Sequence, residues 1–286
     1  MSLDHAADLV KQQTLTRDAF LGGRLVVSQP ERGFRAGLDS VLLGASAGAG
    51  GKRLLDLGAG VGTASLVALA DRPQTTATLA EIDPEMAALA ALNLSANGFA
   101  DRARVLTLDV TAKGSLRSAA GLPADHFDVV IANPPFFDPA AGSAPSAARS
   151  TARHMPPEAL ELWVKTAATH AAPNGEVIFI HAAQSLPLLL PAFTGRFGAV
   201  TVLPLTPRDG EAASRVLVRG IKGSRAPFTL LASRALHEAT TEPHPKTDTT
   251  DPHPELVEGR GGNQGGRSRF RPEFDAIFRG AARLIW

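Results

Sequence analysis

The feature that most constrains the fold is an alternation of short apolar runs with segments of helical periodicity between residues 53 and 205. Such alternation is typical of a parallel β-sheet whose two faces are covered by helices. The apolar repeats predict helices over residues 85–97 and 158–172, with Trp163 on the apolar face of the second. Six strands, each bounded by Gly, Pro, Asp or Asn, are expected at residues 53–57, 76–82, 103–108, 127–132, 176–181 and 199–205.

The end of this region predicts a change of strand direction. An alternating segment at 214–223 follows the sixth strand too closely for an intervening helix, so we expect it to return antiparallel. The predicted fold is therefore α/β and Rossmann-like, a seven-stranded sheet in which five parallel strands close with an antiparallel hairpin. The expected organisation is an N-terminal segment covering substrate and cofactor (1–50), the sheet domain (51–238), a flexible insertion rich in Pro, Gly and Thr (239–272) and a C-terminal segment packing back on the domain (273–286).

Composition excludes several classes of protein. The chain has 286 residues and no cysteine, which rules out disulfides, zinc thiolate sites and cysteine nucleophiles. No run reaches the roughly 18 apolar residues of a membrane span, and the first residues lack a basic segment followed by an apolar one. We expect a cytoplasmic protein without membrane or metal partners, and assume a monomer.

A glycine-rich turn follows the first predicted strand. The segment "LLDLGAGVGTASL" places Asp56, Gly58, Gly60 and Gly62 between that strand and a helix, where glycines let a ligand approach the backbone. A dinucleotide site spaces its glycines as G-x-G-x-x-G, and here the third comes one residue early. The pattern D-x-G-x-G-x-G instead resembles motif I of the class I methyltransferases that use S-adenosyl-L-methionine. The resemblance implies that these four residues bind that cofactor.

Acidic residues end the next two strands. Glu81 ends the second, about 20 residues after the glycines, and Asp109 ends the third. Because open α/β sheets bind ligands at the carboxyl ends of their strands, these acids and Asp56 point to one crevice. The resemblance implies that Glu81 accepts both ribose hydroxyls and that Asp109, with Val110 beside it, receives the adenine amine. Asp83 is a further cofactor candidate, or else simply a helix N-cap.

The fourth strand ends in "NPPF", residues 133–136. This resembles the [DNS]-P-P-[YFW] motif of enzymes that methylate planar exocyclic or amide nitrogens, which are poor nucleophiles because the lone pair is delocalised. We expect the Asn133 side-chain oxygen and the Pro134 carbonyl to accept the two hydrogens of the amine. Pro134 and Pro135 fix the backbone, and Phe136 offers a stacking face where the resembling family usually has tyrosine.

The flanking sequence favours one acceptor. Residues 20–47, "RSTARHM" and the closing "FRPEFDAIFRGAARLIW" resemble the bacterial family that methylates adenine N6 beside the anticodon of valine tRNA. The expected activity is adenine-N6 methylation of RNA, with tRNA as the partner. The alternatives are guanine-N2 methylation of ribosomal RNA, glutamine-N5 methylation of protein and a non-catalytic module that binds cofactor and RNA.

Two arginines and one aspartate complete the candidates. Arg149 and Arg153, four residues apart, are expected either to bind RNA through a phosphate or a neighbouring base, or to lie solvated at a helix start. Asp39 is expected to cap the helix that begins with "SVLLGASA".

Overall fold

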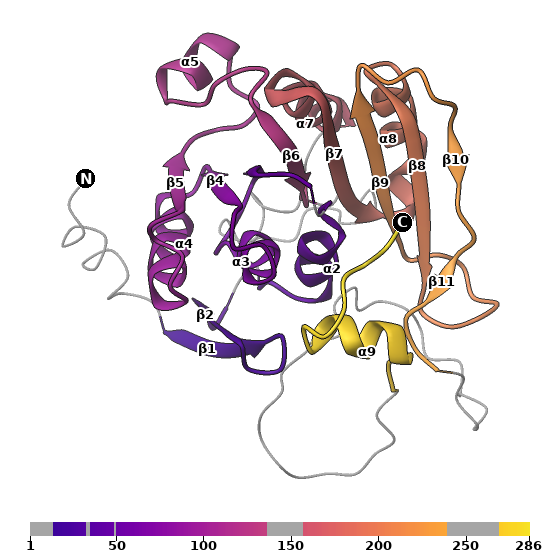
Figure 1. The fold of residues 1–286 in the computed structure, drawn as a ribbon, viewed down its shortest axis with the longest axis horizontal. Helices are drawn as coiled ribbons and strands as arrows, with labels where there is room; N and C mark the ends of the chain where they lie inside the picture. The colour runs from indigo at the N-terminus through magenta and orange to yellow at the C-terminus, as the bar shows by residue number, and fades with distance from the viewer. Residues whose placement is uncertain (1–13, 33–34, 49, 136–156, 239–268) are drawn as a thin grey trace, which may run out of the picture.

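In the computed structural model, the described part of the chain comprises residues 14–32, 35–48, 50–135, 157–238 and 269–286. Its centre is a mixed β-sheet with helices on both faces (Figure 1). From one edge to the other, the long strands run β5 (Ala103–Thr107), β4 (Thr76–Glu81), β3 (Arg53–Leu57), β6 (Phe127–Ala132), β7 (Ala171–Ala182), β9 (Arg215–Lys222) and β8 (Phe197–Thr206).

Strand directions confirm the predicted fold class. The five strands from β5 to β7 are parallel, and β9 is antiparallel to both of its neighbours, β7 and β8. Two short strands that the sequence did not predict, β10 (Thr229–Leu230) and β11 (Arg234–Ala235), pair with β8 and extend that edge. The order reverses between β3 and β6, so their carboxyl ends flank a topological switch point, where such sheets bind ligands.

The sheet separates two apolar cores because successive strand residues point to opposite faces. Leu54, Ile131 and Ile178 face one core, and Leu55, Val130 and Phe179 face the other. The first core is covered by α2 (Leu38–Ser46), α3 (Thr63–Ala70) and α4 (Pro84–Ala96). The second is covered by α7 (Pro157–His170) and α8 (Leu186–Thr194). Two short helices lie between the longer elements: α5 (Gly114–Ala119) before β6, and the 3₁₀ helix η1 (Ala183–Ser185) before α8.

The N-terminal segment contains a hairpin that the sequence did not predict. Strands β1 (Leu15–Phe20) and β2 (Leu25–Pro30) are antiparallel, and two asparagines, Asn93 of α4 and its C-cap Asn97, pair with the outer edge of β2. The Asn93 amide exchanges hydrogen bonds of 2.8 and 2.9 Å with the Ser28 backbone, and Asn97 does the same with Val26. Because the two asparagines are one helical turn apart, they match alternate residues of the strand and satisfy its exposed backbone groups.

The C-terminal residues contact α2. Helix α9 (Pro272–Phe278) lies beside α2 (Figure 1), and the Leu284 amide donates to the Ala45 carbonyl. Most of the predicted insertion lies outside the described residues. Its last residues pair with the chain before it, since the Glu238 amide donates to the Arg269 carbonyl and the Arg271 amide to the Leu236 carbonyl. The two flanks of the segment therefore meet in one short antiparallel contact.

Candidate active site

The turn after β3 has the backbone conformation that its glycines predict. Gly58, Gly60 and Gly62 have φ angles of 67°, 55° and 86°, in the left-handed region that other residues rarely adopt. The Gly58 and Ala59 amides donate to the Ala80 carbonyl at 2.8 and 3.1 Å, which ties the turn to the end of β4. Gly62 is the N-cap of α3, so the turn leads directly into that helix.

Close packing adds to this requirement at Gly58 and, to a smaller extent, at Gly62. A Cβ on Gly58 would lie 2.3 Å from Cη2 of Trp163, because the indole of α7 lies against the turn. A Cβ on Gly62 would lie 3.1 Å from Cδ2 of Leu79, where α3 meets the sheet. Trp163, predicted only as a core residue, therefore covers one side of the candidate cofactor site.

The acids at the ends of β3 and β4 are buried beside the turn. Asp56 is 2% exposed and accepts a 2.8 Å hydrogen bond from the Ser65 hydroxyl. Burial raises the pKa of Asp56 from 3.8 to about 7, and the neighbouring Glu81 adds to the increase. The Glu81 carboxylate accepts from the Gly60 amide at 2.7 Å and from the Asp83 amide at 2.9 Å, and burial raises its pKa as well. The structure thus brings together two carboxylates that the sequence placed at separate strand ends.

The remaining cofactor candidates follow the carboxyl ends of β4 and β5. Asp109 accepts from the Thr111 amide and hydroxyl at 2.8 and 2.7 Å, and Val110 beside it is buried. Asp83 caps α4 by accepting from the Glu85 amide at 2.8 Å. The Asp83 carboxylate is therefore engaged in the helix cap, the structural role that the sequence left open for it.

Ile82 is a further candidate that the sequence did not single out. It stands between Glu81 and Asp83 and is 62% exposed. The sequence signal that could have identified it is an isoleucine directly after the acid that ends a strand. In this position it offers an apolar surface next to the carboxylate expected to hold the ribose.

Asn133 leaves the sheet beside the glycine turn. Leu57 of β3 is in register with Ala132 of β6, and the two strands are parallel, so Gly58 and Asn133 follow at the same level. Asn133 is partly exposed, whereas Pro134 is buried. Three predicted residues, Phe136, Arg149 and Arg153, lie outside the described residues.

A buried histidine contacts the Asn-Pro-Pro turn. His181 of β7 is 1% exposed, and its Nε2 lies 3.4 Å from the Pro135 carbonyl oxygen. Burial lowers the pKa of His181 to about 4, with Arg215 lowering it further and Asp39 opposing this effect. The sequence reasoning missed this residue, because it lies inside an apolar strand 46 positions from Pro135.

The prediction for Asp39 was wrong. The N-cap of α2 is Gly37, and Asp39 lies in the first turn of the helix. Its Oδ2 accepts a 2.8 Å hydrogen bond from Nε of Arg215, an ion pair in which both side chains are 17% exposed. Asp39 therefore connects α2 to β9 near His181.

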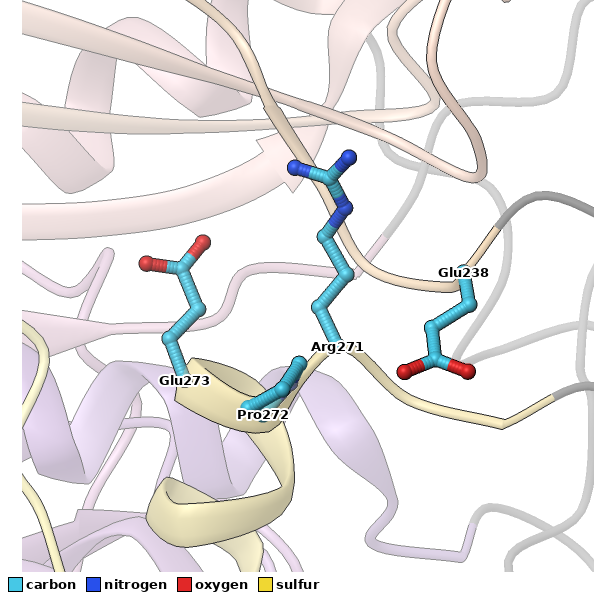
Figure 2. A pocket seen from close by; sticks show the side chains of 4 residues that line it. All are labelled: Glu238, Arg271, Pro272 and Glu273. Carbon is cyan, nitrogen blue, oxygen red and sulfur yellow. The ribbon is translucent and has the colours of Figure 1, made fainter.

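A cavity elsewhere in the structure contains none of these residues. About 450 Å³ in volume, it is lined by Glu238, Arg271, Pro272 and Glu273 at the start of α9. Figure 2 shows Arg271 extending away from α9, with the two glutamates on either side. The Arg271 guanidinium already forms an ion pair with Asp209.

Two negative findings concern the described ranges alone. Within them, no group of three or more His, Asp or Glu side chains is arranged to hold a metal ion. The same residues include no helix both long and apolar enough to cross a bilayer.

Known proteins resemble the chain in sequence and in structure. Residues 40–203 match the model of the methyltransferase small domain family. A Porphyromonas gingivalis tRNA1(Val) (adenine(37)-N6)-methyltransferase is 35% identical over 57% of this chain, a match that spans 64% of that protein, less than two thirds of its length. A protein of the same name from Shewanella amazonensis is 30% identical over 73% of this chain and 88% of that protein.

A solved structure agrees with the sequence matches. A predicted O-methyltransferase, protein Atu636 from Agrobacterium tumefaciens, is 31% identical and aligns with a TM-score of 0.65 over 86% of this chain and 98% of that chain. Its description assigns a different acceptor atom from that named in the two relatives. The family match covers β3 to β7, the glycine turn and the Asn-Pro-Pro turn together, and the chain belongs to the methyltransferase small domain family.

Proposed function

We propose that this protein is an S-adenosyl-L-methionine-dependent methyltransferase acting on the exocyclic N6 amine of an adenine in RNA, with tRNA as the substrate. The observation that carries the proposal is the register of β3 and β6, which places Asn133 level with the glycine turn. A cofactor held by the turn and an amine held by Asn133 then meet at the switch point of the sheet. The names of the two relatives support adenine and tRNA as the acceptor.

The residues at the turn fit this cofactor. Asp56 is a buried carboxylate that accepts a hydrogen bond from the neutral Ser65 hydroxyl, and its raised pKa reflects that environment. The Thr63 hydroxyl, at the start of α3, is buried and has no hydrogen-bond partner in the described structure. These groups suit the ammonium and carboxylate of an amino acid, and Glu81 with Ile82 suits a ribose and its base. When bound, the cofactor supplies an electrophilic methyl group on a sulfonium.

Asn133 and Pro134 perform the acceptor chemistry. An exocyclic amine has a delocalised lone pair, and accepting hydrogen bonds from both of its hydrogens favours the tetrahedral nitrogen that carries the developing positive charge. The Asn133 side-chain oxygen and the Pro134 carbonyl are the two acceptors. Holding the nitrogen in line with the methyl group contributes further, since alignment is worth about 7 kcal/mol or more in well-oriented reactions.

An oxygen acceptor is a second candidate, because the aligned solved structure is described as a predicted O-methyltransferase. A hydroxyl must lose its proton to become a good nucleophile, so that reaction needs a general base with a pKa near the working pH. His181 contacts the turn, but burial lowers its pKa to about 4, which makes it a weak base at neutral pH. Asp56, whose pKa is raised to about 7, lies at the glycine turn on the cofactor side of the site. The acceptor side therefore favours nitrogen over oxygen.

The test supplies methyl-labelled cofactor with separate pools of tRNA, ribosomal RNA and protein, followed by nucleoside and amino acid analysis. We expect label in N6-methyladenosine from tRNA. Label in N2-methylguanosine, in methylglutamine or in an O-methylated product would instead support the corresponding alternative. Adenine in an anticodon loop is a suitable target because extruding a base from a loop costs less than the few kcal/mol needed in a duplex.

Asn133→Ala tests the assigned mechanism. We expect cofactor binding to be retained and kcat to fall about 10²- to 10³-fold, the effect of removing one preorganised hydrogen-bonding group. Asn133→Asp is the matched control, since it keeps an acceptor oxygen at the same position and should retain measurable turnover. Full activity of Asn133→Ala would refute the role given to this side chain.

A further inference from the structure

His181 has no part in the chemistry above, yet its imidazole contacts the Pro135 carbonyl. It reaches the turn from the neighbouring strand, since Ile131 and Ala132 of β6 are in register with Ile178 and Phe179 of β7. The 3.4 Å separation between Nε2 and the carbonyl oxygen is at the long end of hydrogen-bond distances. Contacts of this kind often shorten when a substrate binds.

The charge and tautomer of His181 follow from its surroundings. Burial lowers its pKa to about 4, while hydrogen bonding to the Pro135 and Ala182 backbone opposes that shift. The two nearby charged groups, Arg215 and Asp39, are joined by a 2.8 Å ion pair. The imidazole is therefore neutral at physiological pH and carries one proton. A carbonyl oxygen only accepts hydrogen bonds, so a hydrogen bond between Nε2 and the Pro135 carbonyl requires that proton to be on Nε2.

The turn needs an external contact of this kind. Pro134 and Pro135 have no amide hydrogen, so neither can donate the backbone hydrogen bonds that stabilise most turns. The proline rings fix φ at both positions, but the orientation of the Pro135 carbonyl depends on ψ, which the ring does not fix. A donor held in the rigid strand β7 removes that remaining freedom.

We propose that His181 is a positioning residue, which donates a hydrogen bond from Nε2 to the Pro135 carbonyl and thereby holds Asn133 and Pro134 in the geometry that receives the acceptor amine. The Asp39–Arg215 ion pair, which bridges α2 and β9, supports the neighbouring strand end. This inference rests on the proposed function, because it assumes that the Asn-Pro-Pro turn binds the acceptor.

The first experiment compares two substitutions in the full chain. His181→Leu removes the donor and keeps an apolar side chain, whereas His181→Gln places an amide donor within similar reach of Pro135. We expect His181→Leu to lower kcat about 10- to 100-fold with little change in cofactor Kd, and His181→Gln to recover most of the loss. If His181→Leu does not fold, His181→Asn, whose shorter amide stops short of Pro135, takes its place.

His170 provides a matched control. It is also buried, its pKa is also lowered by burial, and its Nδ1 lies 2.8 Å from the Pro123 carbonyl. It sits at the opposite end of β7 from His181, before the strand begins. His170→Leu should lower the melting temperature without lowering kcat of the folded enzyme.

The second experiment does not depend on activity. Nitrogen NMR of the histidine rings in the cofactor-free protein should show His181 as the neutral Nε2–H tautomer from pH 5.5 to 8. A charged ring or the Nδ1–H tautomer would overturn the inference whatever the substrate proves to be. So would full kcat in His181→Leu, or equal losses in the Leu and Gln variants. Absence of adenine methylation by the wild type, with the expected tautomer, would instead contradict the proposed function.

Discussion

Asp56→Asn isolates the energetic cost of a buried charge at the cofactor site. The substitution removes the charge but keeps the size and an oxygen that accepts from Ser65. Burial raises the pKa of Asp56 from 3.8 to about 7, so the protonated form favours folding. Its contribution to stability is therefore fully present below pH about 3.8 and is lost as pH rises towards 7. The difference between the two pKa values corresponds to about 4 kcal/mol.

We therefore expect Asp56→Asn to raise the free energy of unfolding of the cofactor-free protein at pH 8, by up to about 4 kcal/mol. The gain should shrink steadily as pH falls and be close to zero near pH 4. Urea unfolding followed by circular dichroism at a series of pH values measures it. Asp101→Asn, at an exposed carboxylate, is the control and should show no comparable gain.

Cofactor binding should change in the opposite direction. A cationic ligand favours the ionised carboxylate, so wild-type affinity for S-adenosyl-L-methionine should rise between pH 6 and 8, with proton release on binding below pH 7. In Asp56→Asn that pH dependence should disappear, and affinity at pH 8 should fall about tenfold, which is about 1.4 kcal/mol. A variant no more stable than wild type at pH 8, with unchanged affinity, would refute this account of Asp56.

Two further predictions concern packing. Gly58→Ala should destabilise the protein by about 2–5 kcal/mol, because it combines a positive φ with a Cβ 2.3 Å from Trp163. Gly23→Ala is the control, since φ there is +89° and no atom lies within 4 Å of the added Cβ. Urea unfolding should show only the backbone cost of about 1–2 kcal/mol for this control. Trp286→Ala should destabilise the protein by about 1–3 kcal/mol, because it removes the hydrogen bond to the Ser46 carbonyl and the stacking with Arg219. Ile285→Ala, at a side chain that is 75% exposed, should change the stability by no more than about 0.5 kcal/mol. Equal melting temperatures for these two variants would contradict the docking of the C-terminus.

The parallel strands and the placement of acidic residues at their carboxyl ends could be predicted because their signals are local. Each strand is a short apolar run, and Asp56, Glu81 and Asp109 lie at the ends of three successive predicted strands. Since parallel strands all end at one edge, sequence position alone brings such residues to one side of the sheet. The observed bounds of β3 and β6 are those expected, 53–57 and 127–132. Strand β7 begins earlier, at Ala171, because the chain after α7 already pairs with Phe127 beside a bulge.

The remaining features depend on contacts between distant segments. Asn93 and Asn97 look like ordinary polar positions of a helix, and only the hairpin packed against them shows that they complete the edge of β2. Asp39 sits where a helix cap is plausible, but β9 places Arg215 against it, and the ion pair replaces the cap. In both cases the role of the side chain is set by a contact with a distant segment, which no local sequence pattern predicts.

His181 shows why the acceptor half of such a site needs the three-dimensional structure. The Asn-Pro-Pro segment lacks two amide hydrogens, so its conformation must be set partly by groups outside the motif. The group that meets this need here is a histidine inside an apolar strand, where sequence alone favours a buried core residue. A neutral ring can be held in that apolar setting without the cost of burying a charge, and it still offers a hydrogen-bond donor to the Pro135 carbonyl. The same burial that makes His181 a poor base thus makes it a suitable positioning residue. A neutral histidine in this site is consistent with an amine acceptor, because an amine, unlike a hydroxyl, needs no base to become a nucleophile.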